Sequence, residues 1–241
     1  MKIDLTAMQE MQAQMTNSLV HQRGNRSVFS PDNISYNPES SLSGKRIGFL
    51  GSSITYGFAA NGVSFVDYLQ ARDGVVTTKS AVSGTTLAGT EADNYLYRLK
   101  HQFSGDYDFF VCQLSTNDGR QGKQLGKITP DGQRADFDVE TTIGAIEEVC
   151  AYVHDQLHSP LAFYTCLRDD SDGSYAALIK QLQVLQDKWG FDIIDLFHNE
   201  GLKASLAAHP NAMFDDAHPT QEGYLKVWLP VFERELTNLI E

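Results

Sequence analysis

The sequence predicts an α/β protein in which a parallel β-sheet lies between two layers of helices, a three-layer α/β/α sandwich. From residue 45 onward, apolar stretches rich in β-branched and aromatic residues alternate five times with longer stretches of helical period. The apolar stretches are continuous and do not alternate with polar residues, which is typical of parallel strands with helices on both faces. Right-handed crossovers between such strands leave few topologies for the sheet.

Each expected strand is short and apolar, and each is followed by a helical stretch. The strands are expected in "RIGFLG" (46–51), "VVTTKSA" (75–81), "DFFVCQL" (108–114), "LAFYTC" (161–166) and "FDIIDLF" (191–197). The helices are expected near 63–72, 91–102, 139–158 and 174–189, with a final helix over about 220–240. Residues 1–44 combine a Met- and Gln-rich segment with many turn formers, so we predict an N-terminal extension and connector before a domain of residues 45–241.

The composition limits the classes of partner. The chain has 241 residues, of which 41% are hydrophobic and 21% charged, as in a globular protein with a sizeable core. Its formal net charge of -12 argues against nucleic acid or an anionic membrane surface as the main partner, because both attract clustered Lys and Arg. There is no apolar leader segment and no apolar run of the roughly 20 residues that span a membrane, so we expect a cytoplasmic protein. The sequence leaves the formation of a homo-oligomer open.

Neither the histidines nor the cysteines are spaced as metal ligands. No motif such as H-E-x-x-H occurs, so we expect neither a metal nor a cofactor. The cysteines, Cys112, Cys150 and Cys166, lie far apart in apolar surroundings. This setting predicts buried free thiols in a reducing compartment.

Polar residues follow the first three expected strands. Ser53 lies in "GSSITYG" after the first strand, Gly84 in "VSGTT" after the second, and Asn117 in "STND" after the third. Ligands of such sheets bind outside the carboxyl ends of the strands. In a five-stranded sheet of order 2-1-3-4-5 the first three strands are neighbours, so these three residues are expected to face one point.

A base for this site is available in "FDDAHPT", which contains Asp215 and His218. A serine hydroxyl becomes nucleophilic only when a base removes its proton, and an imidazole needs a partner that fixes its tautomer and stabilises its charge. Asp215 lies three residues before His218 and fits this role. The backbone N–H groups of Ser53 and Gly84 and the side-chain amide of Asn117 are the kinds of donor that stabilise an oxyanion.

These blocks, "GSSIT", "SGTT", "STND" and "DDAHP", resemble the signature blocks of the SGNH/GDSL hydrolase family over residues 45–241. The resemblance implies a flavodoxin-like fold and the cleavage of carboxylic esters without a cofactor. It implies that Ser53 is the nucleophile, His218 the base and Asp215 its partner. It also implies an oxyanion hole formed by Ser53, Gly84 and Asn117.

The sequence departs from the family pattern at two blocks. The family usually has Gly-Asp-Ser where this chain has Gly51-Ser52-Ser53, and Gly-x-Asn-Asp where it has "STND" (115–118). The first departure leaves open which serine attacks, although the spacing to "IT" favours Ser53. The replaced aspartate is not the acid of the family's triad, so its absence affects the support of the loop more than the chemistry.

The sequence leaves a short-chain acyl ester, an O-acetylated sugar, a lysophospholipid and a thioester open as substrates, with short acyl or O-acetyl esters favoured because no broad apolar stripe suggests a lipid surface. The long polar loop 118–138 is expected to border or partly cover the substrate pocket and, with Tyr56 and Phe58, to set specificity. A substrate-facing role for Arg168 is a further option. Two alternatives remain: a flavodoxin-like protein that binds a small ligand or phosphate at the hydroxyl-rich turn, and a family member without catalytic activity.

Overall fold

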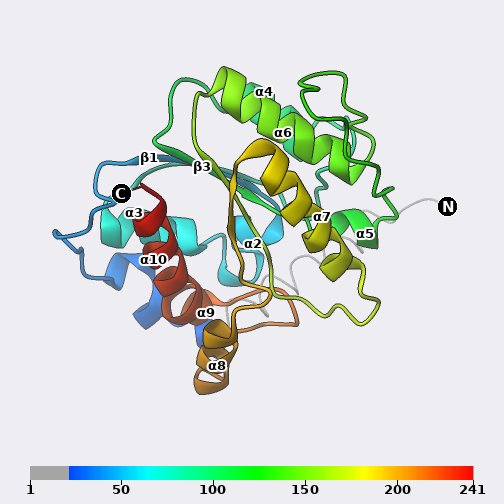
Figure 1. Ribbon diagram of the computed structural model, residues 1–241. Coiled ribbons are helices and arrows are strands. Elements are labelled where there is room, and N and C mark those ends of the chain that lie inside the picture. Colours follow the sequence, from blue (N-terminus) through cyan, green and yellow to red (C-terminus); the bar gives the residue numbers. More distant parts are fainter. Residues whose placement is uncertain (1–21, 241) are drawn as a thin grey trace, which may run out of the picture.

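The computed structural model describes residues 22–240 and confirms the predicted parallel sheet between two helical layers (Figure 1). The sheet in this part of the chain has the order β2-β1-β3-β4-β5, as predicted. Its strands are β1 (Arg46–Gly51), β2 (Val76–Ala81), β3 (Phe109–Gln113), β4 (Leu161–Tyr164) and β5 (Asp192–Ile194). The ends of β2, β1 and β3, and with them the polar residues that follow, therefore lie side by side.

The strand predicted over 191–197 is too long, because β5 ends at Ile194. After this residue, side-chain hydrogen bonds replace the backbone hydrogen bonds of the sheet. The Thr165 hydroxyl donates to the Asp195 carboxylate at 2.7 Å, and the Phe197 N–H donates to the Thr165 hydroxyl at 3.0 Å. These bonds turn the chain away from the sheet.

The main helices of residues 22–240 cover both faces of the sheet. They are α3 (Phe65–Asp73), α4 (Tyr95–Gln102), α6 (Thr142–Gln156), α7 (Ser174–Trp189), α8 (Glu200–Ala208) and α10 (Leu229–Ile240). Short helices are α2 (Ser53–Tyr56), α5 (Asn117–Arg120) and α9 (Gln221–Gly223), and α9 continues through a π-helical turn, Tyr224–Trp228, into α10. Helices α4 and α6 lie on one face, and α3 and α10 lie on the other (Figure 1).

Helix α8 lies in a stretch for which no helix was predicted. The Asn199 side chain caps it by accepting a hydrogen bond from the Leu202 N–H at 2.9 Å. Leu202 is the one residue of α8 that is buried. A helix with so narrow an apolar face leaves little periodic signal in the sequence.

An aromatic cluster joins α3, β4 and α10. The rings of Phe65 and Phe232 stack with centroids 3.8 Å apart, and the Tyr164 ring meets both edge-on at 5.5 and 5.3 Å. All three side chains are fully buried, so they contribute strongly to the apolar core. The cluster holds α10 against the sheet and so also positions α9, which leads into α10. The Thr220 side chain caps α9 directly after the loop that carries His218.

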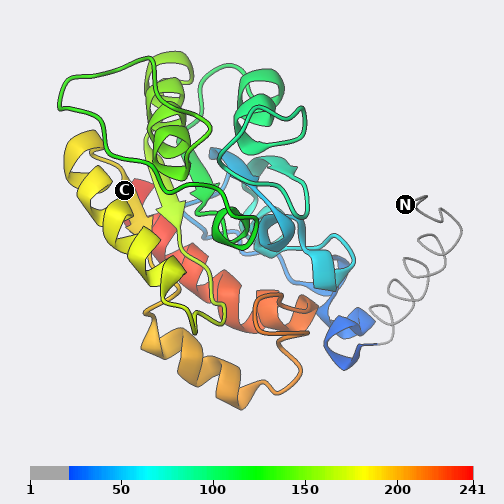
Figure 2. The same cartoon turned by 90° about the vertical axis from the view of Figure 1, so that its right-hand side faces the viewer.

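The described part of the N-terminal extension packs on the domain. Residues 22–33 form three short 3-10 turns beside α9 and α3 (Figure 2). The Asn25 side-chain amide donates to the Ala59 carbonyl at 2.8 Å, and its oxygen accepts from the Gln221 N–H at 2.9 Å. The Met- and Gln-rich segment falls largely outside the described residues, and the boundary at residue 45 stays a prediction.

The loop 118–138 is anchored near its middle. Lys188 of α7 and Glu147 of α6 form a buried ion pair at 2.5 Å, and Thr129 of the loop bonds to both partners. Buried ion pairs need such additional hydrogen bonds to offset the loss of hydration. This anchoring holds the middle of the loop against α6 and α7, whereas the lid function remains a prediction.

The remaining sequence expectations concern membranes and cysteines. No helix within residues 22–240 is both long and apolar enough to cross a bilayer. Cys112, Cys150 and Cys166 are free and buried, as expected. Burial raises the pKa of the Cys166 thiol to about 12, so this group is inert as a nucleophile near neutral pH.

Candidate active site

Ser53 is the first residue of α2 and lies two residues after the last residue of β1. Its Oγ lies 2.9 Å from Nε2 of His218. The serine is 7% exposed, so its hydroxyl lies at the edge of the buried interior. The structure therefore brings together two residues that are 165 positions apart in the sequence.

Asp215 orients the His218 ring from the other side. The Nδ1 atom of His218 lies 2.8 Å from Oδ2 of Asp215, and the N–H groups of Ala217 and His218 also donate to this carboxylate. Burial of the carboxyl opposes its ionisation, but the hydrogen bonds from His218 and Ala217 outweigh this effect and lower the pKa of Asp215 to about 2. An ionised Asp215 assigns the Nδ1 proton to His218 and leaves Nε2 as an acceptor for the serine hydroxyl.

Ser52 points into the protein and away from the histidine. It is fully buried, and its Oγ accepts a hydrogen bond from Nε2 of Gln113 at 3.0 Å. The Oε1 atom of Gln113 in turn accepts from the backbone N–H of Ser52 at 2.9 Å and from the hydroxyl of Thr55 at 2.8 Å. Gln113 thus supports the turn between β1 and α2 from below, at the departure from the family's Gly-Asp-Ser.

Gly84 lies at the apex of a tight turn formed by residues 82–85. The Thr85 N–H and hydroxyl both donate to the Val82 carbonyl, at 3.4 and 2.7 Å. Gly84 has φ +81°, as required at the third position of a type II turn, where a side chain would be strained. The turn lies directly after β2, beside the start of α2.

Asn117 and Asp118, at the start of α5, bind the chain around this turn. The Asn117 side-chain amide donates to the Thr85 carbonyl at 2.8 Å, which leaves its second N–H for another acceptor. The buried Asp118 carboxylate accepts from the N–H groups of Leu87 and Ala88, each at 2.9 Å. The three predicted oxyanion donors therefore belong to adjoining loops.

The other predicted substrate residues differ in their positions. The Phe58 ring lies beside the His218 ring with centroids 5.2 Å apart, and Tyr56 is 44% exposed on α2. Arg168 donates to the Thr116 carbonyl at 3.1 Å and lies over the Tyr175 ring. Its guanidinium thus has protein partners after the end of β3 and at the start of α7.

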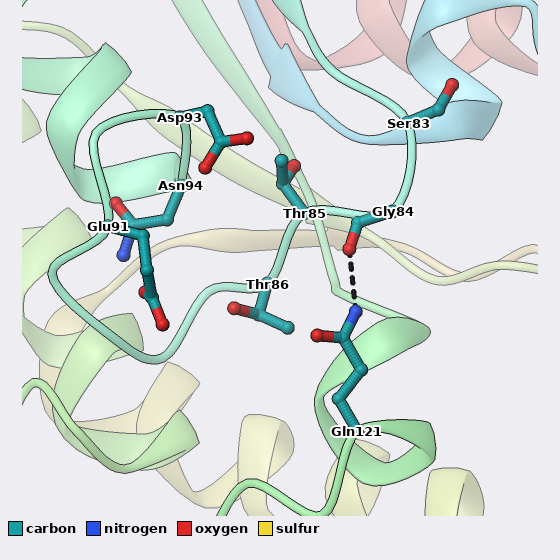
Figure 3. Close-up of a pocket in the computed structure, with 8 residues that line it drawn as sticks. All are labelled: Ser83, Gly84, Thr85, Thr86, Glu91, Asp93, Asn94 and Gln121. Atoms are coloured by element: carbon teal, nitrogen blue, oxygen red, sulfur yellow. Dashed lines mark hydrogen bonds between the residues drawn. The ribbon is translucent and has the colours of Figure 1, made fainter. Parts of the chain in front are cut away.

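A polar pocket with a volume of about 250 Å³ borders the turn of Gly84 (Figure 3). Apart from Gly84, it is lined by polar residues: Ser83, Thr85, Thr86, Glu91, Asp93, Asn94 and Gln121. Figure 3 shows the Gln121 amide reaching the Gly84 carbonyl, with an N–O distance of 2.6 Å. Such a lining offers hydrogen bonds to hydroxylated groups and little contact to an alkyl chain.

Among residues 22–240, no three His, Cys, Asp or Glu side chains are grouped so that they could hold a metal ion. The groups that the described site offers for chemistry are the serine, the histidine, the carboxylate and the N–H donors around them.

Residues 49–226 match the model of the GDSL-like lipase/acylhydrolase family. The chain belongs to this family. Membership of the GDSL-like acylhydrolases supports a hydrolase function. A search of the curated proteins finds no match to the sequence.

Solved structures share the fold of this GDSL-like protein. A protein from Lactobacillus plantarum is 23% identical, with a TM-score of 0.60 over 83% of this chain and 97% of that chain. An acetyl xylan esterase is 16% identical, with a TM-score of 0.56 over 80% and 98% of the two chains. A family two carbohydrate esterase from Clostridium thermocellum, solved with cellohexaose, is 15% identical, with a TM-score of 0.53 over 83% and 66%. At these identities the likeness shows the fold.

Two supporting residues of this GDSL-like site were not found from the sequence. Asp118 directly follows Asn117, and its carboxylate was given no function although it holds the chain after Gly84. Gln113 is a polar residue inside the continuous apolar strand "DFFVCQL". A buried polar side chain needs hydrogen-bond partners, so its position in that strand was the available signal.

Proposed function

We propose that this GDSL-like protein is a serine esterase that cleaves carboxylic esters through an acyl-enzyme on Ser53. The observation that carries the proposal is the continuous line of short contacts from Ser53 through His218 to Asp215, at 2.9 and 2.8 Å. A serine next to an oriented imidazole is the arrangement that activates an alcohol for acyl transfer.

In the first half of the reaction, His218 takes the proton of the Ser53 hydroxyl while Oγ bonds to the ester carbonyl carbon. The carbonyl π electrons move to the oxygen, and the N–H groups of Ser53 and Gly84 and the amide of Asn117 stabilise the resulting oxyanion. When the carbonyl re-forms, the alcohol leaves and takes the proton from His218. The product is an acyl-Ser53 ester.

In the second half, water replaces the alcohol. His218 removes a proton from the water as its oxygen bonds to the acyl carbon, and collapse of the second tetrahedral intermediate returns this proton to Ser53 Oγ. The carboxylic acid leaves and the free serine is restored.

Short acyl esters, and O-acetyl esters of hydroxylated alcohols in particular, are the substrates that we favour. The polar pocket beside Gly84 supports this choice, because its hydroxyl, amide and carboxylate groups would bind an alcohol with several hydroxyls. The acetyl xylan esterase among the solved structures acts, by its name, on such a substrate.

The alternative of a phosphate-binding protein has less support. The hydroxyl of Ser52 bonds to Gln113 inside the protein, and the hydroxyl of Ser53 bonds to His218. The turn after β1 therefore offers few free hydroxyls to a phosphate, and the Asp215–His218 pair has no function in such a protein.

The test is hydrolysis of p-nitrophenyl esters of graded chain length by the wild type and by Ser53→Ala and His218→Ala. Both variants should lose at least about 10³-fold in kcat while keeping the fold, because each removes a participant in proton transfer. His198→Ala is the matched control, since His198 also pairs with an aspartate three residues before it, whereas the Ser53 hydroxyl contacts His218. Full activity of Ser53→Ala would exclude the proposed nucleophile.

A further inference from the structure

Arg98 of α4 is a buried cation whose hydrogen bonds all go to uncharged oxygens. Only 2% of the residue is exposed. Nε donates to the Asp93 carbonyl at 2.8 Å, Nη1 to the carbonyl and hydroxyl of Ser80 at 2.7 and 3.0 Å, and Nη2 to the Gly51 carbonyl and Thr85 hydroxyl at 2.9 and 3.1 Å. Within residues 22–240 no carboxylate forms an ion pair with it: the Asp93 carboxylate acts on it only from beyond ion-pair distance, and the Tyr95 ring lies 5.2 Å from the guanidinium carbon. Burying a charge without a directly paired opposite charge is costly, so an arginine at this position points to a role beyond packing.

The oxygens that Arg98 binds belong to the segments that carry the proposed oxyanion donors. Gly51 ends β1, and its carbonyl lies just before the turn to Ser53. Thr85 follows Gly84, and its carbonyl accepts the hydrogen bond from Asn117 at 2.8 Å. One guanidinium thus reaches the segments of Ser53 and Gly84 directly and that of Asn117 through Thr85.

We propose that Arg98 is a positioning residue that aligns the donors of the oxyanion hole. The inference rests on the proposed esterase function. Arg98 acts from behind the loops and does not touch the substrate. Its planar fork holds five acceptors in fixed directions, whereas a lysine at this position has three donors and no plane. Donors of an oxyanion hole must be aligned before the reaction, because alignment during it would cost free energy.

The bond to Asp93 extends the same alignment to the polar pocket. Thr85 and Asp93 both line this pocket, from the turn and from the segment before α4 (Figure 3). Since Arg98 binds both, its loss would shift the pocket wall together with the Gly84 turn. The main effect is still expected on the transition state, where the negative charge develops beside that turn.

The test compares Arg98→Lys with the wild type on p-nitrophenyl acetate, with the number of competent sites counted by active-site titration. We expect kcat per titrated site to fall about 10- to 100-fold and KM to change less than about threefold, because donors are displaced rather than deleted. Inactivation by a p-nitrophenyl phosphonate, which forms the same tetrahedral geometry at Ser53, should slow by a similar factor. Arg46→Lys, at the opposite end of β1 over the Tyr107 ring, is the matched control and should match the wild type.

A second variant tests the same bond if Arg98→Lys does not fold. Thr85→Val removes the hydroxyl that accepts from Arg98 and that also donates to the Val82 carbonyl, and it should lower kcat, whereas Thr85→Ser keeps both bonds and should recover most of the loss. If Arg98→Lys folds, adding Thr85→Val to it should cost less than Thr85→Val alone costs in the wild type.

The outcomes separate the two proposals. If the wild type shows Ser53-dependent hydrolysis but Arg98→Lys has a normal kcat per titrated site, the role of Arg98 is overturned and the esterase function stands. The same holds if Arg98→Lys yields less folded protein without a lower kcat per titrated site. A wild type without Ser53-dependent hydrolysis would overturn the esterase function and this inference with it.

Discussion

Asp215 and His218 share their local geometry with a second pair, Asp195 and His198. In both pairs the carboxylate lies three residues before the histidine and contacts its Nδ1, at 2.8 and 2.7 Å. Within residues 22–240, only His218 also contacts a serine hydroxyl, that of Ser53. The spacing of Asp and His predicts an oriented imidazole, but the fold decides which imidazole meets a nucleophile.

This comparison gives a prediction with an internal control. Asp215→Asn should lower kcat on p-nitrophenyl acetate by about 10²- to 10⁴-fold, because the amide no longer holds the required tautomer of His218. Asp195→Asn makes the same chemical change at the second pair and should leave kcat within about twofold. Steady-state rates of the purified variants measure both. Equal losses would mean that the two pairs act through stability and not through chemistry.

The orientation of the two adjacent serines is a detail that the sequence could not decide. Both Ser52 and Ser53 follow β1, and the family pattern only favoured the second. The direction of each hydroxyl depends on the backbone at Ser52, with φ -117° and ψ -138°, and on the partner that Gln113 provides. The local sequence shows that a buried Gln113 needs hydrogen-bond partners but not which serine it binds, whereas the residue types of the site could be predicted from their positions after strands.

At the scale of elements, the strongly apolar or periodic segments were predictable. Strands β1 and β3 are almost wholly buried and were predicted to within one residue, because a short continuous apolar run is typical of a parallel strand that is covered on both faces. The ends of β5 and the existence of α8 were missed. Both depend on polar side chains, of Thr165 and Asn199, which bond to the backbone at the end of a strand or the start of a helix.

The loop 118–138 gives a prediction at this scale. Lys188→Met should destabilise the protein by about 3–5 kcal/mol, because it leaves the fully buried Glu147 carboxylate without its partner. The double variant Lys188→Met/Glu147→Leu should recover a large part of this loss. Urea unfolding curves provide the free energies, and an additive loss in the double variant would contradict the coupling.

At the scale of the whole molecule, the alternation of strands and helices predicts the layers, the handedness of crossovers leaves few strand orders, and the family resemblance implies the flavodoxin-like order 2-1-3-4-5. The contacts between α3, α10 and the N-terminal segment do not follow from any of these. They depend on which side chains meet across long separations, such as Phe65 with Phe232. The layers and the strand order could therefore be predicted, whereas the packing of helix on helix required the structure.

One of these helix contacts predicts how global stability depends on pH. Burial and the carboxylate of Asp73 raise the pKa of Glu233 to about 7, despite the nearby Arg72. Between about pH 4.5 and 7 the folded state keeps a proton that the unfolded state has lost. The contribution of Glu233 to stability is therefore complete below pH 4.5 and is lost as the pH rises to about 7.

Glu233→Gln should remove this dependence. Relative to the wild type, the variant should gain about 1 kcal/mol in free energy of unfolding from pH 5 to pH 8, a value reduced because the carboxyl is only half-buried. Glu235→Gln, two residues farther along α10 at a carboxylate that pairs with Arg234, is the control. Parallel pH curves for Glu233→Gln and the wild type would show that Glu233 titrates normally.

Two hydrogen bonds of the Asn25 side chain have a consequence for the order of events in folding. Its amide joins Ala59, beside Phe58, to Gln221, three residues after His218, and the second bond spans 196 positions. A contact between residues so far apart in sequence is expected to form late in folding. The chain loses conformational entropy when it closes such a large loop, and this loss comes before the contact can stabilise the structure. During folding the sheet would thus form well before the Asn25 hydrogen bonds fix the loop of His218 beside Ser53. The onset of ester hydrolysis during refolding would then report the last step of assembly, after the spectroscopic signals of the sheet have already appeared.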